Sequence, residues 1–457
     1  MIESGSKIDH PLTNAPPPDS VRPGIGRGFF WMTWSGIISI GNSVVLWIFL
    51  ARMRDVEELG RFTIIMGLYA LFVSICSLGL MPYLVNEISL RRENPGDSTK
   101  TVIGLISNSG VFLLGSGFVS MLMMTACGFW ASNSVSVRVS TMILSVAMLP
   151  SALNMLAEAT AIAYGRTQLI ALVSTFENVL RTVIPLVLLW LGYDISVICT
   201  SFVAVRFIAI SIYFLAARKN LSNFFFDATE IRSIVRATPT FAGIIILASI
   251  NWQAAVILLA RYSTEAESAK YGAASRFLIP VSILMASYAG VVQPVITKYA
   301  QQGIGQMGTY ISKIVRYPLL VTTIAAALSP FLSRAILIFL FGNGYADAAP
   351  TLDMLALCTI PFCLVMVLSR GLVATGSQHI DLGANALGVA ACVVAGFLLI
   401  PQYGAIGAAA AQLLAFTVMT IIEAGYLSRR VSGLRVWRTA SLSSACLALA
   451  YVVIWKI

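Results

Sequence analysis

The sequence predicts an all-α polytopic membrane protein, with two parallel six-helix lobes around a central cavity and an additional C-terminal helix. Of its 457 residues, 58% are hydrophobic and only 11% charged, and the mean hydropathy is +0.85. A soluble domain has about a quarter of its residues charged, so most of this surface must face lipid. Long apolar stretches and an internal repeat complete the case for this fold and exclude a water-soluble enzyme.

The apolar stretches define the predicted helices, because a spanning helix needs about 20 residues. A polar, proline-containing cytoplasmic tail, residues 1–28, precedes them and has no signal-peptide h-region. Thirteen spans are predicted, at 29–51, 62–88, 101–129, 139–164, 168–191, 195–216, 234–260, 271–297, 310–341, 348–371, 379–400, 404–427 and 437–455.

Lysine and arginine set the predicted orientation, since positively charged loops stay in the cytoplasm. With the N-terminus inside, the cytoplasmic segments hold 18 of these residues and the opposite loops hold seven. The remaining five lie inside helices. We therefore expect a cytoplasmic N-terminus, and thirteen spans would leave the C-terminus outside.

Two pairs of short motifs indicate an internal duplication. Ala51-Arg52 with Gly60-Arg61-Phe62 recurs as Ala260-Arg261 with Gly272 and Arg276-Phe277, and the first pair is offset by 209 residues. Ala163-Tyr164-Gly165 recurs as Ala374-Thr375-Gly376, at an offset of 211. Six helices per half return the chain to its starting side, so the repeats are parallel.

The repeat defines the expected domains. They are an N-terminal lobe at 29–216, a cytoplasmic linker at 217–233, a C-terminal lobe at 234–427 and an additional helix at 437–455. Two such lobes can rock against one another to give alternating access to a central cavity.

The sequence lacks the residues that several classes of enzyme and pump require. The only histidines are His10 and His379, and no phosphate-binding Gly-Lys-Ser/Thr loop is present, so metal-dependent or nucleophilic enzymes and ATP-driven pumps are disfavoured. We expect no metal and no cofactor. The net charge of +10 lies in short loops between apolar runs, so it indicates a membrane and not nucleic acid.

Charges deep in predicted helices are the best candidates for a transport site, because an unpaired charge in the bilayer is costly. Glu177 and Arg181 lie four residues apart on one helix, and Arg206 lies halfway along the next. A neutralised Glu177–Arg181 pair would leave Arg206 without an obvious partner and available to an anionic ligand. A purely structural role for these charges is the alternative.

Other charges lie nearer the predicted helix ends. Arg276, Arg334 and Arg370 could extend to the headgroups, although Arg276 also closes the repeated motif. Four acidic residues cluster toward the cytoplasmic half, where they could form interfacial ion pairs or a gate; they are Glu87, Glu158, Asp381 and Glu423.

One neutral cluster has the chemistry of a sugar site. Asn251, Trp252 and Gln253 lie well inside an apolar run. Tryptophan can stack on a sugar ring, and the two amides can bond its hydroxyls.

The order of several motifs resembles a known transporter family. Ala51 to Phe62 and Ser77 to Leu80 are similar to its helix 1–2 region, and Phe341 to Tyr345 with Ala348 to Leu352 is similar to its helix 9–10 turn. Gly371 to Gly376, leading to Leu399 to Ala409, is similar to its helix 10–12 segment. The chain thus resembles the oligosaccharide/polysaccharide flippases of the multidrug/oligosaccharidyl-lipid/polysaccharide exporter superfamily.

The resemblance implies a flippase that moves an undecaprenyl-diphosphate-linked oligosaccharide to the periplasmic leaflet of a bacterial inner membrane. It implies a cationic cavity, to which Arg181, Arg206 and Arg276 correspond by type and depth. Proton or sodium coupling is compatible with it, with Glu177 or Asp381 as candidates. A polysaccharide polymerase and co-polymerase would be expected partners.

Three alternatives stay open. A drug or cation antiporter of the same superfamily should have unpaired acidic residues deep in a lobe. A flippase of lipid-linked peptidoglycan precursors catalyses the same kind of movement but usually has fourteen helices. From a different class, the protein could be a non-transporting scaffold of a polysaccharide assembly complex.

Overall fold

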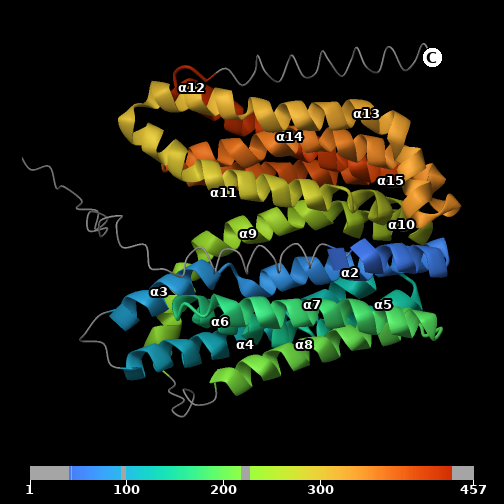
Figure 1. The fold of residues 1–457 in the computed structure, drawn as a ribbon, viewed down its shortest axis with the longest axis horizontal. Helices are drawn as coiled ribbons and strands as arrows, with labels where there is room; N and C mark the ends of the chain where they lie inside the picture. The colour runs from blue at the N-terminus through green and yellow to red at the C-terminus, as the bar shows by residue number, and fades with distance from the viewer. Residues whose placement is uncertain (1–40, 43, 94–98, 218–226, 435–457) are drawn as a thin grey trace, which may run out of the picture.

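The computed structural model describes residues 41–42, 44–93, 99–217 and 227–434, which form two helical lobes lying side by side (Figure 1). Within these ranges every regular element is a helix. Ten helical segments are long and apolar enough to cross a bilayer. The predicted all-helical membrane fold with two lobes is therefore confirmed.

The N-terminal lobe contains the described helices up to residue 217. Leu68, Leu105 and Met148 come from three different helices and are fully buried in its apolar core. Its helices are Val44–Met53, α2 (Val56–Ser77), α3 (Met81–Glu93), α4 (Thr99–Ala131), α5 (Val135–Ser145), α6 (Met148–Ala163), α7 (Thr167–Trp190) and α8 (Ile195–Ala217).

The C-terminal lobe begins with a long helix that crosses toward it from the first lobe (Figure 1). Val367, Ala384 and Leu427 are fully buried in its core. Its elements are α9 (Ala228–Tyr262), α10 (Glu265–Ser275), α11 (Leu278–Gln302), α12 (Ile304–Ile314), α13 (Arg316–Phe341), the 3-10 helix η2 (Asn343–Ala348), α14 (Ala349–Ala374) and α15 (Gln378–Arg430).

Four predicted spans are each two helices joined at a bend, a feature that apolar length alone could not reveal. The first bend lies at Leu78, whose φ is +46°. The Cys76 carbonyl near this bend accepts a hydrogen bond from Ser116 Oγ at 3.0 Å, which satisfies a backbone group inside the bilayer. The other bends separate α5 from α6, α10 from α11 and α12 from α13.

Helix α15 contains both spans predicted at 379–400 and 404–427. It turns back at Gly404, whose φ of +53° and ψ of −125° lie outside the helical region. The two halves pack together, because an added Cβ at Gly388 would lie 2.7 Å from Met419. The prediction of two antiparallel helices is confirmed.

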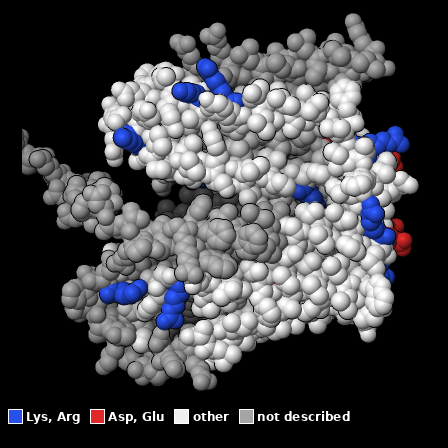
Figure 2. Space-filling model, in the orientation of Figure 1, with Lys and Arg blue, Asp and Glu red and all other residues white. Residues whose placement is uncertain are grey.

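The lobes meet at one end of the molecule and diverge at the other (Figure 1). We call the end with the α3, α12 and α15 termini the basic end, and the end with α10, η2 and Gly404 the mixed-charge end. On the face that Figure 2 shows, the charged side chains at the basic end are Lys and Arg, both charge signs occur at the other end, and a hollow lies between the lobes toward the basic end. The described space between the lobes thus opens toward the basic end.

Some predictions fall outside the described residues. They are the tail at 1–28, the helix at 437–455, most of the span at 29–51 and most of the linker at 217–233. These segments and the exact lobe boundaries remain predictions.

Candidate functional site

The lobes are in close contact at the mixed-charge end, where α2 meets α10. A Cβ atom at Gly60 would lie 1.8 Å from the Glu265 backbone oxygen, and one at Gly272 would lie 2.2 Å from Thr63 Oγ1. Arg61 Nε donates to Glu265 Oε2 at 2.6 Å across the same contact. We call this contact the α2–α10 seal, and it closes the space between the lobes at this end.

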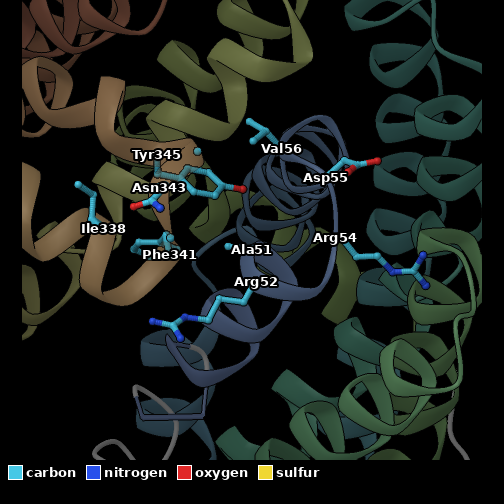
Figure 3. A pocket seen from close by; sticks show the side chains of 11 residues that line it. Ala51, Arg52, Arg54, Asp55, Val56, Ile338, Phe341, Asn343 and Tyr345 are labelled. Atoms are coloured by element: carbon cyan, nitrogen blue, oxygen red, sulfur yellow. The ribbon is translucent and has the colours of Figure 1, made fainter.

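A shallow pocket of about 570 Å³ lies beside the seal, between the end of helix Val44–Met53 and the α13–η2 turn (Figure 3). Arg52 reaches from the first lobe to the second, where its guanidinium donates to the Leu340 carbonyl at 3.0 Å and also to the Phe339 carbonyl. A cation at a helix C-terminus is favourable, so Arg52 stabilises the closed arrangement. None of the site residues predicted from the sequence lines this pocket.

Arg276 lies at the bend between α10 and α11, inside the junction of the two lobes. Its guanidinium carbon sits 3.7 Å from the centre of the Trp47 ring, which belongs to the other lobe and is buried. Among the described residues no carboxylate forms an ion pair with Arg276, and its Nε atom has no hydrogen-bond partner. Arg276 is thus a partly buried cation held by a ring face and available to an anion.

This position corrects the sequence expectation that Arg276 could extend to the headgroups. Helix α10 begins at Glu265 and not near residue 271, so Arg276 lies at the C-terminal end of this helix instead of near the start of one. Because the start of α10 is polar, the length of the apolar stretch did not predict that these residues are helical.

The predicted charges of the first lobe do come together. Glu177 on α7 lies 2.9 Å from Arg206 on α8 and 3.5 Å from Arg181 on its own helix. Arg206 Nε also donates to the Tyr69 hydroxyl of α2 at 3.1 Å. The Arg181 guanidinium lies 4.9 Å from the centre of the Phe202 ring. These residues form one network, which we call the N-lobe cluster.

The expectation that Arg206 lacks a partner is wrong. Arg206 makes the shorter contact with Glu177, whereas Arg181 is the more distant cation and has an unpartnered Nε. The cluster nevertheless has two arginines on one glutamate, with Glu158 close enough to interact electrostatically with Arg206. Glu177 is buried, and both arginines are partly buried.

The three residues of the predicted sugar site face different partners. The Trp252 ring packs edge-on against Phe362 and Phe416 of the C-terminal lobe, at centroid distances of 5.3 and 5.9 Å. Asn251 is buried with its amide 3.2 Å from Met419 Sδ. Gln253 faces the other way, toward Gly67 of α2.

A second charged cluster lies inside the C-terminal lobe. Glu423 of α15 is fully buried, neither of its carboxylate oxygens has a hydrogen-bond partner among the described residues, and Asp381 and Arg370 lie close enough to interact with it electrostatically. Asn385 donates to Asp381 Oδ1 at 3.1 Å. Because an ionised carboxylate without a partner is costly to bury, this C-lobe cluster is a place where a proton can be held.

Two of these placements differ from the sequence expectation. Glu423 and Asp381 are not interfacial ion pairs, and Arg370 faces this pair of acids instead of extending to the headgroups. Glu87 does form an ion pair near the basic end, with Arg91 at 2.9 Å. Arg91 also binds Glu230 at 2.7 Å and so links α3 to the start of α9.

No metal centre is evident in the described ranges, where no three His, Cys, Asp or Glu side chains cluster suitably. The fold, its charged interior and its two-lobe junction define a polytopic membrane transporter. The family model described as polysaccharide biosynthesis protein matches residues 25–300, and the one described as Lipid II flippase MurJ matches residues 256–457. The chain belongs to the polysaccharide biosynthesis protein family.

Solved structures with the same fold are flippases and transporters. The chain resembles "Lipid II flippase MurJ, inward closed conformation" with a TM-score of 0.71 at 15% identity, covering 94% of this chain and 92% of the other. It resembles an inward-facing multidrug resistance MATE family transporter of the MOP superfamily with a TM-score of 0.68 at 12% identity, covering 92% and 98%.

An outward-facing MATE transporter of that superfamily matches with a TM-score of 0.57 at 12% identity, covering 89% of this chain and 96% of the other. A search of curated protein sequences finds no significant match.

Proposed function

We propose that the protein is a flippase that moves an undecaprenyl-diphosphate-linked oligosaccharide from the cytoplasmic to the periplasmic leaflet of a bacterial inner membrane. The polysaccharide biosynthesis family and the flippase fold support a lipid-linked substrate. A diphosphate-sugar head cannot cross hydrocarbon unaided, because its charges would lose their hydration. A charged space between two lobes can replace that hydration while the lipid tail stays in the bilayer.

The observation that carries the proposal is Arg276. It is a cation at the junction of the lobes with no described carboxylate partner, and Trp47 covers one face of its guanidinium. Arginine binds phosphate through charge-assisted, often bidentate hydrogen bonds. Arg276 would therefore bind the diphosphate, and the N-lobe cluster would add positive charge at Arg181.

The proposed direction follows from the two ends of the molecule. Positively charged loops mark the cytoplasmic side, so the basic end would face the cytoplasm. The space between the lobes then opens to the leaflet where the substrate is made, and the α2–α10 seal closes the other side. Rocking of the lobes would open the seal and release the head group on the periplasmic side.

The proposal is tested by mass spectrometry of lipid-linked oligosaccharides in cells that lack the gene and carry wild type or a variant at equal expression. Loss of charge-assisted hydrogen bonds worth about 1.5–3 kcal/mol should make Arg276→Ala bind the diphosphate roughly 10- to 150-fold more weakly. A completed lipid-linked oligosaccharide should then accumulate, as in the empty strain.

Arg334→Ala is the matched control, because Arg334 is an exposed arginine on the surface of α13. It should clear the intermediate as wild type does. Clearance by Arg276→Ala, or no accumulation in the strain that lacks the gene, would refute the proposal. Normal export in each of the three single variants, Arg276→Ala, Arg181→Ala and Arg206→Ala, would favour a non-transporting scaffold.

We also propose that the C-lobe cluster couples flipping to protons. Glu423 is fully buried with both carboxylate oxygens unpartnered among the described residues, beside Asp381 and one arginine, so binding or loss of a single proton changes the charge inside this lobe. Glu177 is the weaker candidate, since two arginines neutralise it. A polymerase and co-polymerase would take the flipped oligosaccharide.

The same cluster favours a second candidate, a drug or cation antiporter. The sequence expectation was that such a transporter has unpaired acidic residues deep in a lobe, and Glu423 is fully buried in a cluster of two acids, Glu423 and Asp381, with one arginine. Increased sensitivity to cationic drugs in the strain that lacks the gene, without accumulated oligosaccharide, would support this candidate.

A further inference from the structure

A group of basic side chains covers the outer corner of the C-terminal lobe at the basic end. They come from the end of α11, from α12, from the start of α13 and from the end of α15. All five are exposed: Lys298, Lys313, Arg316, Arg429 and Arg430. Figure 2 shows basic side chains over this part of the molecule without acidic atoms beside them. We call these five residues the α12 corner.

Close packing brings these cations together from distant parts of the chain. Gly308 of α12 lies directly against the Ser432 backbone that follows α15, and Ser312 Oγ donates to the Gly433 carbonyl at 3.4 Å. The ends of α12 and α15 are therefore fixed beside one another. Lys313 and Arg430 belong to one surface although they lie more than 100 residues apart in sequence.

The positive charge of the corner is not neutralised within the described residues. None of the five cations forms an ion pair there. No acidic residue occurs between Glu267 and Asp347, and none follows Glu423, which is buried. The corresponding end of the first lobe differs, because Arg91 is paired with Glu87 and Glu230.

Aromatic and apolar side chains surround the cations. Tyr299 and Tyr310 pack with ring centroids 4.8 Å apart, and the Arg430 guanidinium lies 5.4 Å from the Tyr426 ring centre. Tyr317 and Ile304 are 61% and 53% exposed beside them. Tyrosine and arginine or lysine above exposed apolar groups are typical of the membrane–water interface.

We propose that the α12 corner binds the phosphate headgroups of anionic phospholipids in the leaflet at the basic end. The corner lies on the outer edge of its lobe, away from the space between the lobes, so it is not part of the transport path (Figure 1). Unpaired cations with aromatic neighbours at headgroup depth fit a lipid phosphate better than a water-soluble partner. The bound lipid would hold this lobe in place while the other lobe moves.

The test uses the full-length protein in detergent, titrated with short-chain phosphatidylglycerol or phosphatidylcholine and observed by native mass spectrometry. Each cation near an anionic lipid contributes roughly fivefold to affinity. The double variants Lys313→Gln with Arg316→Gln, and Arg429→Gln with Arg430→Gln, should each lose phosphatidylglycerol affinity by about 25-fold.

Arg138→Gln with Arg334→Gln removes two charges elsewhere and is the control, which should bind phosphatidylglycerol as wild type does. Circular dichroism and size-exclusion chromatography establish that each variant is folded. Equal affinity of wild type for the two lipids would overturn the proposal, as would unchanged phosphatidylglycerol binding in both corner variants. Displacement of phosphatidylglycerol from the wild-type protein by micromolar inorganic phosphate would also overturn it, because the site would then be one for free phosphate.

Discussion

Substitution of Gly60 by alanine should weaken the α2–α10 seal and shift the protein away from the closed arrangement described here. The added Cβ would lie 1.8 Å from the Glu265 oxygen, and an ordinary contact needs at least 3.4 Å, so the two helices must separate by about 1.6 Å. The obstacle is backbone, which cannot rotate away as a side chain could. Helices α2 and α10 must therefore move apart as whole helices.

The size of the effect follows from the cost of overpacking, about 1–3 kcal/mol. That free energy would lower the ratio of closed to open molecules by about 5- to 150-fold. Gly272→Ala should have a smaller effect, since its Cβ meets the Thr63 side chain at 2.2 Å and a side chain can adjust. Gly104→Ala is the control, because nothing lies within 4 Å of its Cβ position.

Double electron–electron resonance measures this directly. Spin labels at Asp194 and Asp347 would lie on opposite lobes at the mixed-charge end, in a background whose seven cysteines are replaced. The distance distribution should shift to longer values in the order Gly60→Ala, Gly272→Ala, Gly104→Ala, the last equal to wild type. A Gly60→Ala distribution that superimposes on the control would refute the assignment of this contact as the seal.

Three further predictions follow from the polar contacts. Arg61→Ala and Glu265→Ala should each open the seal by less than about fivefold, and a double-mutant cycle should give a coupling below about 1 kcal/mol, because both side chains are partly exposed. Glu423→Gln should abolish any dependence of flipping on an imposed pH gradient, measured in proteoliposomes, whereas exposed Glu57→Gln should retain it. Asp227 accepts hydrogen bonds from Thr229 at the start of α9, which lowers the pKa of its carboxyl. Asp227→Ala should therefore lower the melting temperature at pH 7, and the difference should vanish as the pH falls through that lowered pKa.

The sequence was sufficient to place the described apolar helices along the chain. Apolar length predicted the described spans, and the Gly404 turn lies at the start of the span predicted at 404–427. The bends were not predictable, because the length of an apolar stretch does not indicate where a helix changes direction. The bend at Arg276 matters most, since it places this side chain at the lobe junction.

The contacts between side chains were harder to predict from the sequence than the helices were. An i,i+4 pair within one helix can be recognised directly, so Glu177 was assigned to Arg181. Its shorter contact is with Arg206 on the next helix, and that contact depends on how the two helices are rotated about their axes. Likewise, consecutive helical residues point about 100° apart, so Trp252 and Gln253 face different lobes despite their adjacency.

The positions of Arg276 and the seal explain how opening one end can control binding. Trp47 covers Arg276 and also packs against Phe62 at a centroid distance of 5.3 Å, and Phe62 follows Arg61 of the seal. Separation of α2 from α10 must therefore disturb the aromatic contacts that hold the Arg276 guanidinium. A bound diphosphate would make charge-assisted bonds that Trp47 cannot supply, so it stabilises whichever arrangement leaves Arg276 free to bind. Under the proposed function, substrate binding and lobe movement would thus be linked through one cation, and a protein with Trp47→Ala should lose this linkage while its seal remains intact.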